Sequence, residues 1–360
     1  MQLVQSRIPG IDGLRGMAVL MIVIFHYVTT AINPEGDLFV NTLFRLTHYF
    51  NSGVDLFFII SGFLITRNLI VKKISWEAIK GYLFKRGRRI LPLYYIGLAL
   101  CALLFLSNMG SQTVWYYSGE IPWYSYVFFF QNECMAWNGS LGSRLLSVYW
   151  SLGIEIQFYL LMPLILFLFK ANGRIVFCIA TIVLAVVFRL WDTTWIGSYT
   201  HFYCRMDALF SGVLLALLSA NNQFMNLLKD KTRLIEISAL LLFLFAVGLS
   251  LNVIAFPSHF IPSFFILFYS ALLILQLSPN SFLSEFSNHG ILQFLGKYSY
   301  GMYIMHEIVR FAIFQFAASR LPGLSGFSDI IYTTLSFGLT IVISVVVYHQ
   351  IEMKFLSVKY

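Results

Sequence analysis

The chain has 360 residues, of which 59% are hydrophobic and 11% are charged, and its formal net charge is +8. An ordinary soluble domain has roughly 25% charged residues, so this composition leaves too little polar surface for a soluble fold. Apolar stretches of about 20 residues, long enough to cross a ~30 Å hydrocarbon layer, recur from Leu14 to Tyr348. We therefore predict an all-α, polytopic integral membrane protein that forms a single domain over residues 1–360.

Apolar length, together with breaks at Pro, Gly and polar residues, predicts about ten transmembrane helices. They cover residues 14–31, 53–70, 90–107, 150–169, 175–191, 206–220, 233–251, 261–277, 298–318 and 329–349. The first stretch follows Arg7, as in a secretory signal, but it contains His26 and further spans follow it. We expect it to be retained as a helix.

The basic residues indicate how the bundle is oriented. With both termini in the cytoplasm, most of the 24 Lys and Arg residues fall on the cytoplasmic side, as the positive-inside rule requires. The exceptions, which fall toward the outside, are Arg45, Arg144, Arg189, Arg205, Arg310 and Arg320. The positive charge is thus explained by topology, and we expect no nucleic-acid partner.

Two predicted loops differ in character. Residues 67–89, on the cytoplasmic side, are rich in Lys and Arg and contain one acid, Glu77. Residues 107–149, on the outside, are rich in aromatic residues, and their apolar run at 127–130 is too short to span, so it should be interfacial or re-entrant.

The four cysteines form no Cys-x-x-Cys pair and no metal-like spacing with histidine, which argues against zinc or haem. Cys134 and Cys204 both fall on the predicted outer side, but spacing cannot establish a disulfide between them. We expect the cysteines to be unpaired and no metal to be bound.

Several ionisable residues fall inside predicted spans, where each costs about 2.5–3.5 kcal/mol and normally faces the bundle interior. Positions within the helices place His26, Asp55 and Glu155 at similar depth in the outer half. Arg15 lies eleven residues before His26, about 16 Å along the axis and ~20° around it. Arg15 and His26 therefore share one helix face.

Four further charges lie near the same level, and they could be structural pairs: Glu307 with Arg310, and Arg205 with Asp207. A lone histidine on an apolar helix is also often only an interhelical hydrogen-bonding group. His26, however, has an arginine on its own face and two carboxylates at its depth. This combination favours a catalytic site.

The cluster fits acyl transfer to a hydroxyl group. Such a reaction needs a base for the hydroxyl proton, and histidine accepts protons near neutral pH. A carboxylate on its other ring nitrogen would fix the tautomer, and Asp55 and Glu155 are alternative candidates for that role. The phosphates of coenzyme A suit cytoplasmic arginines, here Arg86, Arg88 and Arg89, although topology alone explains part of that basic patch. We expect Arg15 to bind the acyl-CoA donor with them.

Five motifs in order carry a family resemblance. They are IDGLRG at 11–16 leading to His26 (R-x10-H), GVDLFFIISGFLI at 53–65, RGRR at 86–89 (similar to RxxR), WSLGIEIQFY at 150–159 and GKYSYGMYIMH at 296–306. Together they cover nearly the whole chain, which resembles the acyltransferase 3 family of membrane proteins. That family includes acyltransferases of O-antigen, exopolysaccharide and Nod factors.

The resemblance implies a multi-pass enzyme of the bacterial inner membrane with acyl-CoA, in the simplest case acetyl-CoA, as co-substrate and no permanently bound cofactor. It implies that His26 and Arg15 are essential, that the RxxR arginines serve the acyl donor, and that an extracytoplasmic or lipid-linked glycan is the acceptor. Ser61, Trp150 and His306 lie within the matching motifs, and we expect them to support the site or bind substrate.

In several family members an extracytoplasmic hydrolase-like domain follows the membrane part. Because this chain stops at Tyr360, we expect no such domain here. The protein would then complete the transfer itself or pass the acyl group to a partner in polysaccharide biosynthesis or export.

Two other functions remain open at this point. A proton-coupled secondary transporter would also have intramembrane His, Asp and Glu residues, but it predicts inverted repeats and broken helices, which the sequence lacks. A structural subunit of a polysaccharide export complex would tolerate His26→Ala.

Overall fold

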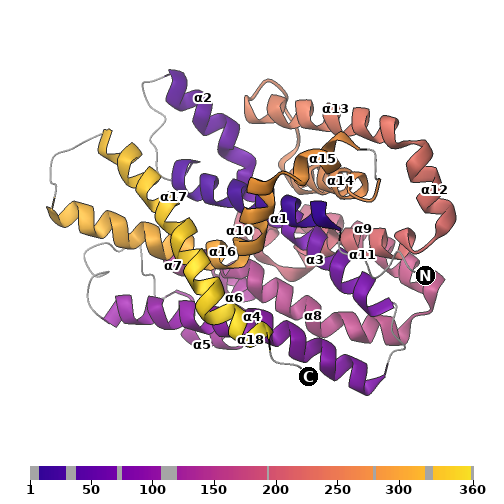
Figure 1. Ribbon diagram of the computed structural model, residues 1–360, viewed down its shortest axis with the longest axis horizontal. Helices are drawn as coiled ribbons and strands as arrows, with labels where there is room; N and C mark the ends of the chain where they lie inside the picture. The colour runs from indigo at the N-terminus through magenta and orange to yellow at the C-terminus, as the bar shows by residue number, and fades with distance from the viewer. Residues whose placement is uncertain are drawn as a thin grey trace.

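The computed structural model describes residues 8–29, 38–70, 75–106, 120–192, 194–278, 281–320 and 327–357, and their regular elements are all helices (Figure 1). Among these residues, nine helical segments are long and apolar enough to cross a membrane. The long helix α16 (Gly290–Arg320) is not among these nine segments. The protein is therefore an all-helical, polytopic membrane protein, as predicted.

The long helices are α1 (Pro9–Ile24), α3 (Gly53–Ile70), α4 (Trp76–Leu106), α8 (Trp150–Leu168), α9 (Ala171–Trp191), α11 (Phe202–Ser219), α13 (Thr232–Ser250), α14 (Ile261–Leu275), α16 (Gly290–Arg320) and α17 (Phe327–Val347). Shorter helices connect or extend them: η2 (Phe25–Thr29), α2 (Leu38–Thr47), η3 (His48–Ser52), α5 (Trp123–Val127), α6 (Gln131–Asn138), α7 (Arg144–Ser147), α10 (Trp195–Thr200), α12 (Asn222–Asp230), η4 (Ser258–Phe260), α15 (Phe282–Ser287), η5 (Tyr348–Glu352) and α18 (Met353–Leu356).

Each of the ten predicted helices corresponds to one long helix, but two begin well before the predicted start. α4 already begins at Trp76, so much of the predicted cytoplasmic loop is helical. α16 begins at Gly290. Apolar length marks only the part of a helix inside the hydrocarbon, and in α4 the Lys, Arg and Glu residues, which are good helix formers, extend the helix into water. In α16 the added turns are mostly apolar, and Gly296 and Lys297 separate them from the predicted span.

In the predicted outer loop, residues 120–149 form α5, α6 and α7. The apolar run at 127–130 consists of the last residue of α5 and the turn between α5 and α6, in which Phe129 has a positive φ of 60°. The ring of Phe129 packs 4.8 Å from that of Tyr94 on α4, so the turn is anchored to the bundle. Residues 107–119 lie outside the described residues. The four cysteines are buried and unpaired, as expected.

Glycines bring α1 and α16 into close contact. A Cβ atom at Gly16 would overlap the backbone oxygen of Leu292, and a Cβ at Gly296 would overlap that of Asp12. Small residues at a helix interface let the two backbones approach closely. The same device joins α3 and α11, where Gly62 faces Leu209 and Gly212 faces Ile59.

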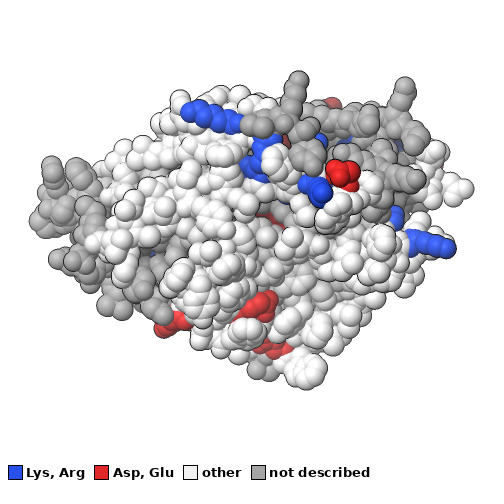
Figure 2. All heavy atoms as spheres, turned by 90° about the horizontal axis from the view of Figure 1, so that it is seen from below, with Lys and Arg blue, Asp and Glu red and all other residues white. Residues whose placement is uncertain are grey.

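The surface of the bundle matches a lipid environment. On the face in Figure 2, the Lys and Arg side chains lie toward the upper and right-hand part of the view, together with some acidic side chains, and further Asp and Glu side chains lie along the lower edge; most of the surface between is uncharged. On the peripheral helix α13 (Figure 1), large apolar side chains are exposed, namely Leu240, Leu241, Phe243 and Leu244. Exposed apolar side chains are stable there only against lipid.

Candidate active site

His26 lies in η2, a π-helical turn that continues α1. Single π-turns inside helices occur frequently at functional sites. Nδ1 of His26 lies 3.0 Å from Oε1 of Glu307 on α16, and Nη1 of Arg310 donates a 2.5 Å hydrogen bond to the His26 carbonyl oxygen. Both the ring and the backbone of His26 are thus positioned by α16.

Glu307 is a buried carboxylate with two guanidinium neighbours. Its side chain is 1% exposed; Oε2 lies 3.5 Å from Nε of Arg144 and Oε1 lies 3.7 Å from Nη1 of Arg310. Buried charges are tolerated when they are paired, so the predicted Glu307–Arg310 pair is confirmed. A proton on Nδ1 of His26 faces this carboxylate, which leaves the basic lone pair on Nε2.

The prediction that Asp55 or Glu155 supplies the carboxylate for His26 is therefore wrong, because Glu307 occupies that position. All of these carboxylates were expected at similar depth, but depth along one helix does not determine which helices are neighbours. The glycine contact between α1 and α16 brings Glu307 next to His26.

His306, the residue before Glu307, is fully buried, and its ring centroid lies 5.0 Å from that of His26. Its Nδ1 lies 2.8 Å from the carbonyl oxygen of Tyr303 and 3.1 Å from that of Met302. Carbonyl oxygens only accept, so Nδ1 carries the hydrogen. In the neutral form, Nε2 is then an acceptor, and it has no hydrogen-bond partner among the atoms that the structure describes.

Within the described part of the chain, His26, His306 and Glu307 could also hold a metal ion, since their ligand atoms lie within 4.8 Å of one another. Two histidines and a carboxylate are a common zinc ligand set. Here Arg144 and Arg310 already compensate the carboxylate, and their positive charges would oppose a divalent cation. The electrostatics favour the triad as an acid–base group.

A cavity of about 100 Å³, which we call the arginine cavity, is lined by Arg15 of α1 and by Arg86 and Arg89 of α4. Arg86 and Arg89 are three residues apart, so they lie on the same face of α4. Three cations around one cavity can bind a phosphate-bearing ligand. The predicted grouping of Arg15 with the RxxR arginines is thus found for these three.

Glu155 also lines the arginine cavity, and it accepts hydrogen bonds of 2.5 Å from Ser61 Oγ and Tyr159 Oη. Glu155 therefore lies with the arginines rather than beside His26. Arg88 is not among the lining residues; its guanidinium lies 5.2 Å from the ring centroid of Phe84. It was expected with the other arginines, but it is about 100° from Arg89 around the helix.

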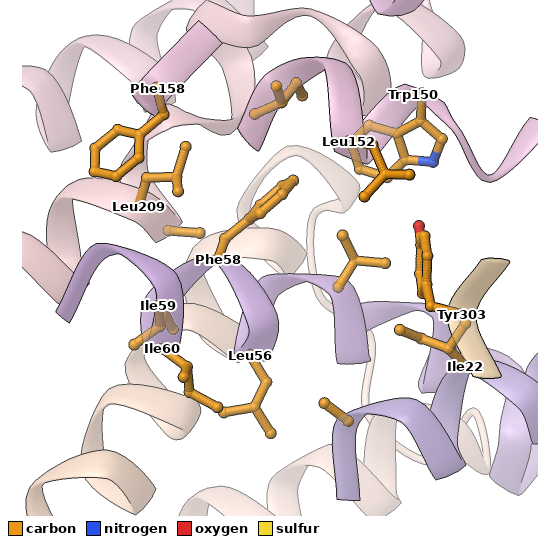
Figure 3. Close-up of a cluster of buried hydrophobic side chains, with 14 of the residues drawn as sticks. Ile22, Leu56, Phe58, Ile59, Ile60, Trp150, Leu152, Phe158, Leu209 and Tyr303 are labelled. Carbon is orange, nitrogen blue, oxygen red and sulfur yellow. The ribbon is translucent and has the colours of Figure 1, made fainter. Parts of the chain in front are cut away.

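A second cavity of about 60 Å³, the histidine cavity, is lined by His26, Trp150 and Asn51 and adjoins the first. Val54 and Tyr303 line both cavities. Figure 3 shows Tyr303 of α16 and Trp150 of α8 within the central apolar cluster. The hydroxyl of Tyr303 donates a 2.9 Å hydrogen bond to the carbonyl oxygen of Val148, which fixes this wall.

A third cavity of about 560 Å³, the wide cavity, contains Asp55. Asp55 forms a buried ion pair with Arg205, and Asp207 pairs instead with Arg189 at 2.6 Å. The expected Arg205–Asp207 pair is therefore replaced by two interhelical pairs. Both the wide and the histidine cavities are lined by Phe25, Asn51, Trp195 and Tyr199.

Sequence reasoning missed the role of Glu307 beside His26, the contribution of Arg144, and Tyr303 as the shared wall. Glu307 directly follows the last motif, which ends at His306, and it had been placed at the right depth. A deeply placed acid beside a motif histidine was therefore a usable signal. Arg144 and Tyr303 had no comparable signal, because a loop arginine and a motif tyrosine are both common.

Comparison with known proteins identifies the family. The sequence model of the acyltransferase domain of the acyltransferase 3 family matches residues 8–349. The chain is 26% identical to the "Putative O-acetyltransferase" of Staphylococcus aureus (strain COL) over 97% of its own length and 57% of that protein. It is 27% identical to the peptidoglycan O-acetyltransferase OatA of Listeria monocytogenes over 83% of its length and 49% of the relative.

The chain thus spans about half the length of the curated relatives it matches. No solved structure matches it. The family match covers almost all of the chain and includes His26, Glu307 and the three cavity arginines. The chain belongs to the acyltransferase 3 family.

Proposed function

We propose that this chain transfers an acyl group, most simply acetyl, from cytoplasmic acyl-CoA to a hydroxyl of an extracytoplasmic or lipid-linked glycan. One observation carries the proposal: a cavity lined by three arginines adjoins a cavity that contains a histidine paired with a buried carboxylate. The first suits the phosphates of the donor, and the second suits activation of a hydroxyl.

In the proposed reaction, Nε2 of His26 removes the acceptor hydroxyl proton while the hydroxyl oxygen attacks the thioester carbonyl. The C–S bond then breaks, and the imidazolium returns the proton to the leaving thiolate of coenzyme A. Glu307 stabilises the imidazolium between these steps. Arg144 and Arg310 hold the carboxylate in place without removing its charge.

The names of the relatives support acetyl as the acyl group, and the OatA relative of Listeria, named for peptidoglycan, supports a cell-wall glycan as the acceptor class. Acetyl-CoA is then the donor, and no other cofactor is needed for the reaction. The corresponding location is the cytoplasmic membrane of a bacterium, with the arginine cavity accessible from the cytoplasm.

The test compares acyl groups on cellular glycans by NMR in wild type, a deletion strain and strains that carry single variants. We expect His26→Ala to lose acylation as the deletion strain does. His289→Ala, a change at an exposed histidine between α15 and α16, is the control and should match wild type. Arg89→Ala should lower acylation more than Arg88→Ala, since only Arg89 lines the arginine cavity. Unchanged acylation in both the deletion and His26→Ala would disprove the function.

A further inference from the structure

The proposed reaction makes no use of the wide cavity, although this cavity adjoins the histidine cavity and shares four lining residues with it. Along the η3–α3 segment, Asn51 and Asp55 line the wide cavity, whereas Ser61 and Leu64 line the arginine cavity. The wide cavity therefore lies at the N-terminal end of α3, whereas the arginine cavity extends from Val54 toward the middle of the helix. A ligand entering the wide cavity would approach His26 from the side away from the donor.

An aromatic row runs along the boundary between the wide and histidine cavities. Trp195 is 63% exposed, and its ring is stacked on that of Tyr199 with a centroid distance of 5.3 Å and an interplanar angle of 9°. The ring of Tyr199 in turn lies 4.5 Å from that of Trp150, which lines the histidine cavity. The row thus leads from an exposed indole toward His26.

The segment that carries Trp195 is held rigidly. The hydroxyl of Thr194 caps α10 by accepting a hydrogen bond from the backbone N–H of Gly197, and that hydroxyl also donates to Asp192 at 2.7 Å. The next residue after α10, His201, contacts Glu133 of α6 at 2.6 Å. An exposed aromatic ring that is already fixed loses little conformational entropy when a ligand stacks on it.

The charges of the wide cavity are compensated. Asp55 pairs with Arg205, and Arg189 pairs with Asp207. The cavity is therefore polar without a strong net field, which suits an uncharged, hydroxyl-bearing ligand better than a phosphate. In addition, the buried Nε of Arg205 has no hydrogen-bond partner among the described atoms and can donate to a ligand oxygen.

We propose that the wide cavity is the acceptor subsite, in which the apolar face of a pyranose ring stacks on Trp195 and directs a neighbouring hydroxyl toward His26. This inference rests on the proposed function and extends it by naming the residues that select a saccharide. Pyranose rings have an apolar C–H face that stacks on aromatic rings and a polar rim of hydroxyls, which Asn51 and Arg205 can bind.

The contrasting explanation for Trp195 is membrane anchoring, since tryptophan is enriched at membrane interfaces. The chain offers a matched control for it. Trp191 at the end of α9 is 80% exposed and does not line the wide cavity. An anchoring role would make Trp191→Ala and Trp195→Ala equivalent.

The experiment measures steady-state transfer by the full chain in lipid nanodiscs, with labelled acetyl-CoA as donor and, as acceptor, the glycan fraction extracted from the deletion strain. We expect Trp195→Ala to raise the KM for glycan about five- to tenfold, with kcat and the KM for acetyl-CoA little changed. Trp195→Phe should retain most of the affinity, and Trp191→Ala should match wild type.

The subsite would be overturned by equal glycan KM values for Trp195→Ala and Trp191→Ala, or by a change confined to the KM for acetyl-CoA. In either case the proposed function would still hold if His26→Ala is inactive. Transfer that persists in His26→Ala would overturn the proposed chemistry instead. Thermal unfolding of each variant separates lost binding from lost folding.

Discussion

The charges around His26 are connected as one unit. Its ring contacts Glu307, its carbonyl oxygen accepts from Arg310, and Arg144 contacts the second carboxylate oxygen. A carboxylate in this position fixes the histidine tautomer and stabilises the imidazolium that forms in the reaction. The carboxylate that contacts the His26 ring is thus on another helix, 281 positions away in the chain by their numbers.

This arrangement predicts that Glu307→Gln lowers the acyl-transfer rate by about a hundredfold or more, because the amide keeps the shape but not the charge. Initial rates in membranes, with protein amounts matched by immunoblot, measure the effect. Glu285→Gln, at an exposed position of α15, is the control and should match wild type. A Glu307→Gln rate close to wild type would show that His26 acts without a carboxylate.

For single residues, the sequence predicted the candidate site residues more fully than it predicted their contacts. His26, Arg15, Arg86 and Arg89 were identified from charge inside a span and from motif spacing, and the structure groups the arginines as expected. The predicted carboxylate partner of His26 was wrong. A sequence indicates the depth of Asp55 and Glu307 in the membrane, but it does not indicate which way their helices are rotated. Interhelical neighbours depend on packing between distant segments.

At the scale of helices, the α1–α16 contact places the site. Gly16 and Gly296 allow the two backbones to touch, and this contact sets the height of His306 and Glu307 against His26. The spans themselves were predictable from apolar length, but the early starts of α4 and α16 were not. The first turns of α4 are rich in charged residues, and the apolar run of α16 is interrupted by Gly296 and Lys297.

We therefore predict that Gly296→Ala destabilises the protein, by about 1–3 kcal/mol, because the added methyl group overlaps the backbone oxygen of Asp12. Gly290→Ala, on the same helix, is the matched control, since nothing lies within 4 Å of a Cβ there. Thermal unfolding in detergent measures both. Equal thermal unfolding midpoints for the two variants would mean that α1 and α16 can move apart without loss of stability.

At the scale of the whole molecule, the three cavities adjoin one another and outline the path that we propose for donor and acceptor. The arginine and histidine cavities share Val54 and Tyr303, and the histidine and wide cavities share the aromatic row. Composition predicted a membrane bundle, but no local pattern could predict a path, because its walls come from helices far apart in the chain. Tyr303 and Trp150 meet only after folding (Figure 3).

The direction of this path depends on the orientation of the bundle, which cysteine labelling can test. The native cysteines give little background because all four are buried, and burial also raises the pKa of the Cys134 thiol. A neutral thiol reacts slowly with maleimide. New cysteines can report on the two ends of the bundle. One replaces Lys80 on α4, whose side chain is 48% exposed, and the other replaces the exposed Asn138 on α6.

With the arginine cavity open to the cytoplasm, a membrane-impermeant maleimide should label Asn138→Cys in cells whose outer layers have been made permeable to it. It should label Lys80→Cys only after the cytoplasmic membrane is broken. The positive-inside rule is the physical reason, since the Lys and Arg side chains on the face in Figure 2 lie toward its upper and right-hand part. The reverse labelling pattern would place His26 nearer the cytoplasm than the arginines. Acyl-CoA from the cytoplasm would then not reach the arginine cavity before the histidine, which would contradict the proposed donor path.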